Sequence, residues 1–440
     1  MSKCCNLLLS TAILSCCSTL FAQPAAPPPD ALPAQQNMAR RFENQIRQFL
    51  EMELRHFARV GKVGEDKVDA IRNATADLVK AEATSMADDI GRGVDPGRTM
   101  GLSDEIQERF NEVAQKTLSD ASAFEAYSED KKLREKLLRT AAQRSLVIAL
   151  DGIISLSKQQ EGAIARTLMS SWNDDWNPIA FAGSQIGGFI MFQQLKGFEV
   201  EKLKPALRES QYMVLKGITD MDTNQFRADR MGIFRLEADQ FVQMAAEEIG
   251  ELCNLSAAQA DKLSTSFQNA ADAAIQKKEE AFILIRQREP GQPQADMKAM
   301  EALSTPIPQL IKKSDAWDAG ISDTLDEKQQ ALVRQREELR EKRAKSATAA
   351  MIANSFFGMQ LSLSGKQIQA LTSVFVDNVG PGFASGMQAQ MEQLTTIPEP
   401  LFKDILDDDQ LIKLSNLMGQ IRQQMAMMKQ KPQPQAVPVE

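Results

Sequence analysis

The stretch CNLSAAQADKL, residues 253–263, places a serine in front of a helical pattern and a glutamine three residues after that serine. A serine at the N-cap of a helix accepts a hydrogen bond from the backbone N–H three residues on. A glutamine at that third position accepts, in turn, from the backbone N–H of the cap, and a leucine before the cap packs over the turn. Ser256 and Gln259 therefore predict a helix that begins directly after Ser256.

Near-copies of this phrase recur along the chain, each beginning with leucine and ending with glutamine. Either serine or aspartate stands at the cap position, and both side chains accept hydrogen bonds from backbone N–H groups. Each copy therefore predicts the start of a further helix and requires no ligand. The predicted cap pairs are Ser157 with Gln160, Ser256 with Gln259, Asp326 with Gln329, Ser364 with Gln367, and Asp407 with Gln410.

Weaker relatives of the phrase place Gly64, Ser128 and Arg208 at the cap position. In chain order, the first four cap positions (64, 128, 157 and 208) match the last four (256, 326, 364 and 407). Similarity at one long period indicates an internal duplication. We therefore expect two similar tandem helical modules, at residues 38–225 and 226–428.

The segments between these phrases predict helices. Apolar residues recur at three- and four-residue spacing along residues 133–152 and 411–428, as on one face of a helix. We find no convincing run of alternating strands, and the abundant alanine, leucine, glutamine and methionine favour helix. We therefore predict an all-α fold. The apolar segment at residues 179–192 is expected to be a buried helix, and its glycine pairs leave a strand or a hairpin of helices as alternatives.

Residues 1–22 have the layout of a secretory signal, with Lys3 before an apolar run and a small residue at Ala22. The run is shorter than the about 20 residues that span a bilayer, so we expect cleavage near Ala22 and export to the periplasm or beyond. Residues 13–16 loosely resemble a lipobox, which makes a lipid on Cys16 the alternative. A proline-rich linker at residues 23–37 and a disordered tail at 429–440 are expected around the modules.

The chain contains 51 basic and 59 acidic residues, with a net charge of −8, which argues against nucleic acid or an anionic membrane as the main partner. The basic stretch at residues 334–345 interleaves with acids and is expected to be a solvated helix face. Four of the five cysteines lie in the expected signal, so no internal disulfide is expected. The remaining Cys253 follows apolar residues at helical spacing, which predicts a buried thiol.

Few residues of the chain are suited to catalysis. His56 is the one histidine, and a hydrolase triad most often uses histidine as its base. It stands on a predicted helix near Glu53 and Arg59, and we interpret it as a satisfied or solvent-facing side chain. One histidine and one mature cysteine cannot form the usual zinc sites, and we expect no catalytic residue, no cofactor and no metal.

Carboxylates leave one enzymatic alternative. Asp174 and Asp175 stand between Trp172 and Trp176, and two acids beside aromatic rings suit a carboxylate-only, glycosidase-like hydrolase. A packed loop between helices explains the same residues. We prefer the loop, because the matching segment of the second module, residues 379–383, contains no acid.

The phrases also carry two resemblances. GELCNLSAAQADKL at residues 250–263, SDAWDAGISDTLDEKQQ at 314–330 and the later LSLSGKQIQAL resemble uncharacterised secreted proteins of planctomycete bacteria, which implies a location and a fold but no reaction. The LSxxQ phrase is also similar to the LTxxQ phrase of periplasmic chaperones of the Spy and CpxP type. We therefore predict a non-catalytic binding or scaffold protein of the cell envelope, whose partner is a protein or another envelope component. A structural spacer is the further alternative.

Overall fold

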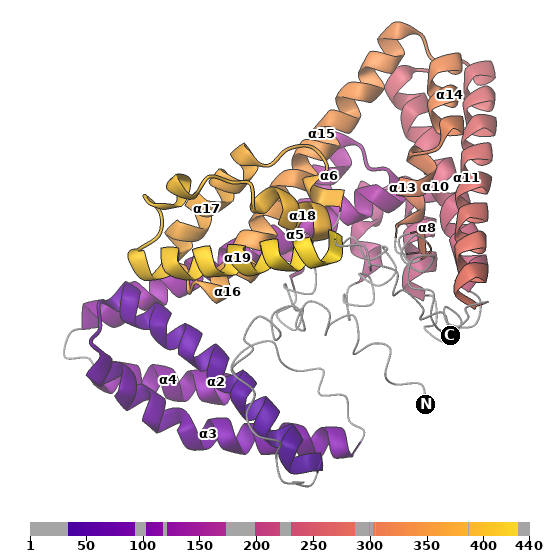
Figure 1. Cartoon of the computed structure of the whole chain (residues 1–440). Helices are drawn as coiled ribbons and strands as arrows, with labels where there is room; N and C mark the ends of the chain where they lie inside the picture. Colours follow the sequence, from indigo (N-terminus) through magenta and orange to yellow (C-terminus); the bar gives the residue numbers. More distant parts are fainter. Residues whose placement is uncertain are drawn as a thin grey trace, which may run out of the picture. The chain divides into compact units, whose positions relative to one another are not determined.

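The computed structural model describes residues 34–92, 103–117, 121–172, 199–220, 230–286, 299, 302–303, 305–385 and 387–429. All the regular structure in these ranges is helical (Figure 1), and they contain no strand. The all-α prediction is therefore confirmed. The signal, most of the linker, the segment at residues 179–192 and nearly all of the expected tail lie outside the described residues.

The chain divides into two compact units. Unit 1 comprises residues 1–135, 356–379 and 387–440, and unit 2 comprises residues 136–355 and 380–386. The limits between them therefore lie near residues 135 and 355, whereas the sequence repeat suggests a boundary near residue 225. Each unit therefore contains residues from both the first and the second half of the chain.

Unit 1 begins with a hairpin of two long helices, whose facing sides are apolar. Phe57 is fully buried, and its ring lies edge-on to Phe110 at 5.6 Å and to Tyr127 at 5.2 Å between centroids. Each such buried aromatic contributes about 1.5–3 kcal/mol. The helices are α2 (Ala34–Gly61), α3 (Glu65–Gly91), α4 (Asp104–Thr117), the start of α5 (Ala121–Ile154), α16 (Gly358–Gln360), α17 (Gly365–Asn378), α18 (Met387–Leu394), η5 (Glu399–Phe402) and α19 (Asp408–Lys429).

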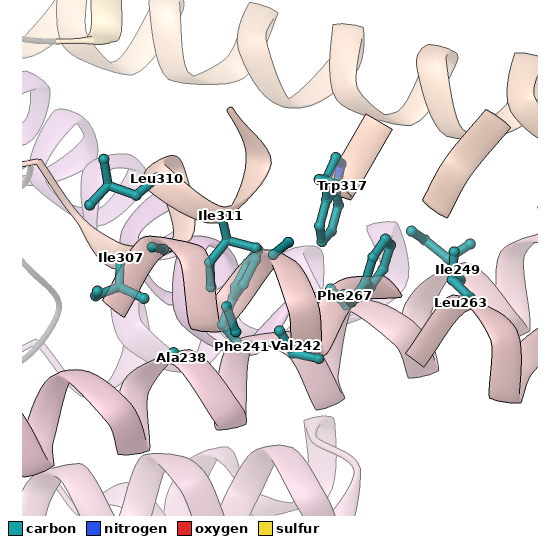
Figure 2. Close-up of a cluster of buried hydrophobic side chains, with 14 of the residues drawn as sticks. Ala238, Phe241, Val242, Ile249, Leu263, Phe267, Ile307, Leu310, Ile311 and Trp317 are labelled. Atoms are coloured by element: carbon teal, nitrogen blue, oxygen red, sulfur yellow. The ribbon is translucent and has the colours of Figure 1, made fainter. Parts of the chain in front are cut away.

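Unit 2 contains a second hairpin, and short helices cover one of its faces (Figure 1). Figure 2 shows this core: Trp317 stacks on Phe267 with 3.7 Å between ring centroids, and Ile311 lies over the same hairpin. The helices are the rest of α5, α6 (Lys158–Ser170), η2 (Val200–Ala206), α8 (Glu209–Asp220), α10 (Arg230–Cys253), α11 (Ala257–Arg286), α13 (Ile307–Lys312), α14 (Asp315–Thr324), α15 (Glu327–Met351) and η4 (Phe383–Ser385). The π-helix η3 (Ile352–Phe357) continues from α15.

Four helix-to-helix turns share one backbone conformation. In each turn a residue with positive φ follows the helix, an apolar residue comes next, and the N-cap position of the following helix stands third. Such a left-handed residue ends a helix by turning its last backbone groups toward one another. Matching cap positions at 64 and 256, and at 157 and 364, therefore occupy the same place in the same kind of turn. The residues with positive φ are Lys62, Ser155, Asn254 and Ser362.

The expected cap at Ser128 is wrong. Ser128 lies inside α5, which begins at Ala121 and runs without interruption to Ile154. The preceding Tyr127 is buried in the core of unit 1, at 1 % exposure, and donates a hydrogen bond to Glu53. A turn at this position would remove that side chain from the core, so helical packing overrides the local capping signal.

Candidate functional site

All five predicted cap pairs make both bonds of a capping box. In the first, Gln160 N donates to Ser157 Oγ at 3.3 Å, and Ser157 N donates to Gln160 Oε1 at 2.9 Å. The same two bonds join Ser256 with Gln259, Asp326 with Gln329, Ser364 with Gln367, and Asp407 with Gln410.

The cap glutamines also bond to one another in pairs. Gln160 Nε2 donates to Gln211 Oε1 at 2.7 Å, Gln259 Nε2 to Gln329 Oε1 at 3.2 Å, and Gln367 Nε2 to Gln410 Oε1 at 2.8 Å. Gln211 is fully buried, and its Oε1 accepts from the backbone N–H of Arg208, so it acts as a cap glutamine although arginine stands at the cap. The phrase therefore joins two helix starts as well as beginning each helix. The only sequence signal for Gln211 is the weak copy of the capping motif around Arg208.

His56 lies in a buried polar cluster of unit 1. Its side chain is fully buried, and Nε2 lies 3.1 Å from Asp130 Oδ2. Asp130 also accepts from the backbone N–H of Gly365 at 3.0 Å. Burial alone would raise the pKa of Asp130, but the bonds from His56 and Gly365 and the nearby positive charges hold it below its ordinary value. The solvent-facing interpretation of His56 is therefore wrong: the ring is buried beside Asp130, and its Nδ1 has no hydrogen-bond partner among the described residues.

Glu53 lies beside this cluster. Tyr127 Oη donates to Glu53 Oε1 at 2.6 Å, and Arg134 Nη2 donates to the same oxygen at 2.9 Å. Burial opposes the ionised form of Glu53, but the charge and hydrogen bond of Arg134 outweigh it and lower the pKa of Glu53 to about 2. A carboxylate held so firmly in its ionised form is a poor general base. The cluster is therefore suited to stability rather than to acid–base catalysis.

A second buried cluster lies in unit 2, on α15. Arg336 Nε donates to Glu248 Oε1 at 3.0 Å, and Arg336 Nη2 donates to Glu161 Oε1 at 2.8 Å. Arg340 binds both carboxylate oxygens of Asp151, at 2.9 and 2.8 Å. The expectation that residues 334–345 form a solvated face is therefore wrong for Arg336 and Arg340. Acids on three other helices surround this face, a long-range arrangement that interleaved charge along one helix cannot reveal.

Asp174 and Asp175, the two acids of the enzymatic alternative, lie outside the described residues. Among the residues that are described, no three His, Cys, Asp or Glu side chains are grouped so that they could hold a metal ion. Cys253 is buried and free, and its Sγ donates to the carbonyl of Gln329 at 3.6 Å. None of the described helices is long and apolar enough to cross a membrane.

A groove of about 730 Å³ lies between α10 and α11 in unit 2. Its floor consists of buried and half-buried small or apolar residues: Val242, Ala246, Gly250 and Ala260. A Cβ built on Gly250 would meet no described atom within 4 Å, so the space in front of this glycine is open. We refer to this feature as the groove; the small residues themselves are the only feature of the sequence that indicates it.

The rim of the groove carries carboxylates that already have partners. Asp239 accepts from Gln268 Nε2 at 3.1 Å across the two helices. Glu251 pairs with Arg208 at 3.0 Å, and Glu247 accepts from the hydroxyl of Ser210 at 2.8 Å. Each of these acids therefore contacts a polar or basic side chain of another element.

The first hairpin has larger side chains at two positions that match the groove lining in sequence. The positive-φ residues Lys62 and Asn254 align the two hairpins with an offset of 192 residues. Ala246 then matches Leu54, and Ala260 matches Val68, which are 0 % and 2 % exposed in the core of unit 1. At both positions the second hairpin, which has the groove, therefore carries the smaller side chain.

Comparisons with known proteins give no relative for this arrangement: no family model, no curated protein and no solved structure matches the chain.

Proposed function

We propose that the protein is an exported, non-catalytic helical binding protein of the cell envelope, and that the groove between α10 and α11 is its binding site. The groove itself is the observation that carries this proposal. It has an apolar floor, a polar rim and the elongated lining of two helices, which suit a peptide segment. A structural spacer would have no need for such an opening.

Export rests on the sequence of residues 1–22, and lipidation of Cys16 is the alternative route to the envelope. The similarity of the LSxxQ phrases to those of Spy and CpxP-type chaperones supports a chaperone-like role by analogy. The capping boxes themselves do not add to that support, because capping alone explains the same letters.

Site-specific photocrosslinking tests the proposal. A photoreactive residue replaces Gln243, which is exposed in the groove lining, or Ala273, which is exposed on α11 and does not belong to the lining. Each variant is irradiated with the envelope fraction of its native source, and adducts are identified by mass spectrometry. We expect a discrete protein adduct from position 243 and none from position 273. Equal labelling at both positions, or none at either, would contradict a binding role for the groove.

A further inference from the structure

We propose that the groove receives a basic amphipathic helix of a partner protein, an inference that rests on the proposed function. Two helices form its walls, so its length runs along the hairpin. Helix-in-groove recognition places the apolar face of one helix on such a surface, with anchoring side chains spaced three and four residues apart. Small residues on the floor let the incoming backbone come close.

The first hairpin indicates which side chains the groove takes. There, Leu54 and Val68 occupy the positions of Ala246 and Ala260 and are buried in the core of unit 1. The missing aliphatic volume in the second hairpin therefore matches leucine- and valine-sized side chains. We therefore expect the partner helix to place leucine- or valine-sized side chains where the first hairpin has Leu54 and Val68.

Charge selects the polar face of the partner. Asp239, Glu247 and Glu251 line the groove, and Arg208 is the basic side chain that pairs with the last two, at 3.9 and 3.0 Å. Three carboxylates against one guanidinium leave the rim negative, and the whole chain has a net charge of −8. A helix with lysine or arginine beside its apolar face is therefore attracted, and an acidic helix is repelled.

The test uses two fluorescein-labelled synthetic helices of 18 residues, both with leucine on one face and with either lysine or glutamate on the other. Binding to the full-length mature protein is measured by fluorescence anisotropy at low salt and at 0.5 M NaCl. In the filled variant, Ala246→Leu with Ala260→Val, the side chains of the first hairpin occupy the groove. The matched control, Ala258→Leu with Ala273→Val, adds the same atoms at exposed positions of α11 outside the lining.

We expect the lysine helix to bind at least tenfold more tightly than the glutamate helix, and the filled variant to lose that binding tenfold or more while the control keeps it. Equal binding of both helices, or binding that the filled variant retains, would overturn the inference. If position 243 still crosslinks an envelope protein while neither helix binds, the assignment of a basic helix fails and the proposed function stands.

An ion pair at a helix cap occurs in each of the two units. In unit 1, Arg59 Nε donates to Asp407 Oδ2 at 2.7 Å, and in unit 2, Arg208 Nη1 lies 3.0 Å from Glu251 Oε1. Arg59 and Glu251 are equivalent by the offset of 192 residues, and Asp407 and Arg208 stand at equivalent caps. The two ion pairs therefore occupy the same place with their charges reversed.

The reversed charges of these two ion pairs favour one pairing of the segments over the other. If each module closed on itself, Arg59 would face Arg208 and Glu251 would face Asp407, so both pairs would repel. In the observed units both pairs attract. We infer that the chain consists of two copies of one module that have exchanged segments: the described residues of 38–135 pack with described residues that follow residue 355, and the described residues of 226–355 pack with described residues of 136–220. Residues 380–386, which belong to unit 2, are the exception.

Cysteine pairs in a Cys253→Ser background test the exchange. A Cβ built on Gly365 would lie 3.1 Å from Leu133 Cβ, close to the spacing of a disulfide, and Leu133→Cys removes the atoms that would clash. Lys158 holds the position equivalent to Gly365 in the first module. We expect Leu133→Cys with Gly365→Cys to form an intramolecular disulfide in the monomer, and Leu133→Cys with Lys158→Cys to remain reduced. A 133–158 bridge, or no 133–365 bridge, would overturn the exchange.

Discussion

Gln367 and Gln410 bond to each other in both directions: Gln367 Nε2 donates to Gln410 Oε1 at 2.8 Å, and Gln410 Nε2 donates back at 3.3 Å. Each glutamine also accepts a hydrogen bond from the backbone N–H of its own cap residue. Each donates a further bond to a carbonyl just before the other helix, Gln367 to Ile405 and Gln410 to Leu361. These hydrogen bonds hold the starts of α17 and α19 together. A sequence motif that predicts only a local helix cap therefore also makes a tertiary contact.

Gln410→Ala should reveal this role, because Gln410 is fully buried. Its loss leaves the backbone N–H of Asp407, the carbonyl of Leu361 and the amide of Gln367 short of a partner. Since a buried unpaired polar group costs about 1–3 kcal/mol, we expect the free energy of unfolding to fall by ~3 kcal/mol. Urea denaturation measures the change, with the exposed Gln369→Ala on α17 as control. A loss equal to that of the control would contradict the role of Gln410 in joining the two helix starts.

Arg336 provides a second test, because its guanidinium joins α15 to α6 and α10. Arg336→Met leaves Glu161 and Glu248 buried beside a smaller set of positive charges. Breaking a buried pair in this way typically costs about 3–5 kcal/mol, whereas the exposed Arg334→Met should change stability by less than about 0.5 kcal/mol. Thermal unfolding at neutral pH compares the two variants. Similar midpoints for both would restore the solvated-face interpretation of this helix.

The sequence predicted a helical fold and the starts of the helices that follow its cap motifs, because capping depends on residues within one turn. The same reasoning failed at Ser128, where the burial of Tyr127 keeps α5 continuous. It failed again at Arg336, whose partners lie 88 and 175 residues away. The groove was equally hidden, because Ala246 and Ala260 become informative only beside Leu54 and Val68 of the first hairpin. Patterns within short stretches of a single sequence do not show which distant segments come into contact.

Glu53 should make unit 1 sensitive to acid. Its pKa is lowered from an ordinary 4.5 to about 2 in the fold, so the unfolded chain binds a proton first as pH falls. Its stabilising contribution is complete above pH 4.5, is lost progressively between pH 4.5 and 2, and amounts to about 3 kcal/mol. Glu53→Gln should lower stability at pH 7 and flatten the acid limb of the stability profile. The exposed Glu108→Gln is the control, and an unchanged acid limb in Glu53→Gln would assign the sensitivity to other carboxyls.

Glu237 on α10 should act in the opposite direction. Burial raises its pKa from 4.5 to about 7, and the charge of Lys278 offsets only part of that effect. The Lys278 ammonium is itself held by the carbonyls of Leu303 and Thr305, at 2.7 and 2.6 Å. Because the folded chain holds this proton more tightly than the unfolded chain, its contribution is complete below pH 4.5 and declines as pH rises toward 7.

Glu237→Gln keeps the shape of the protonated carboxyl and removes its titration. We expect this variant to match the parent protein near pH 4.5, to exceed its stability by roughly 2–3 kcal/mol at pH 8, and to lose the decline between those values. Chemical denaturation at half-unit pH steps measures the difference, with the exposed Glu280→Gln on α11 as control. A constant difference between variant and parent at every pH would mean that Glu237 does not titrate in this range.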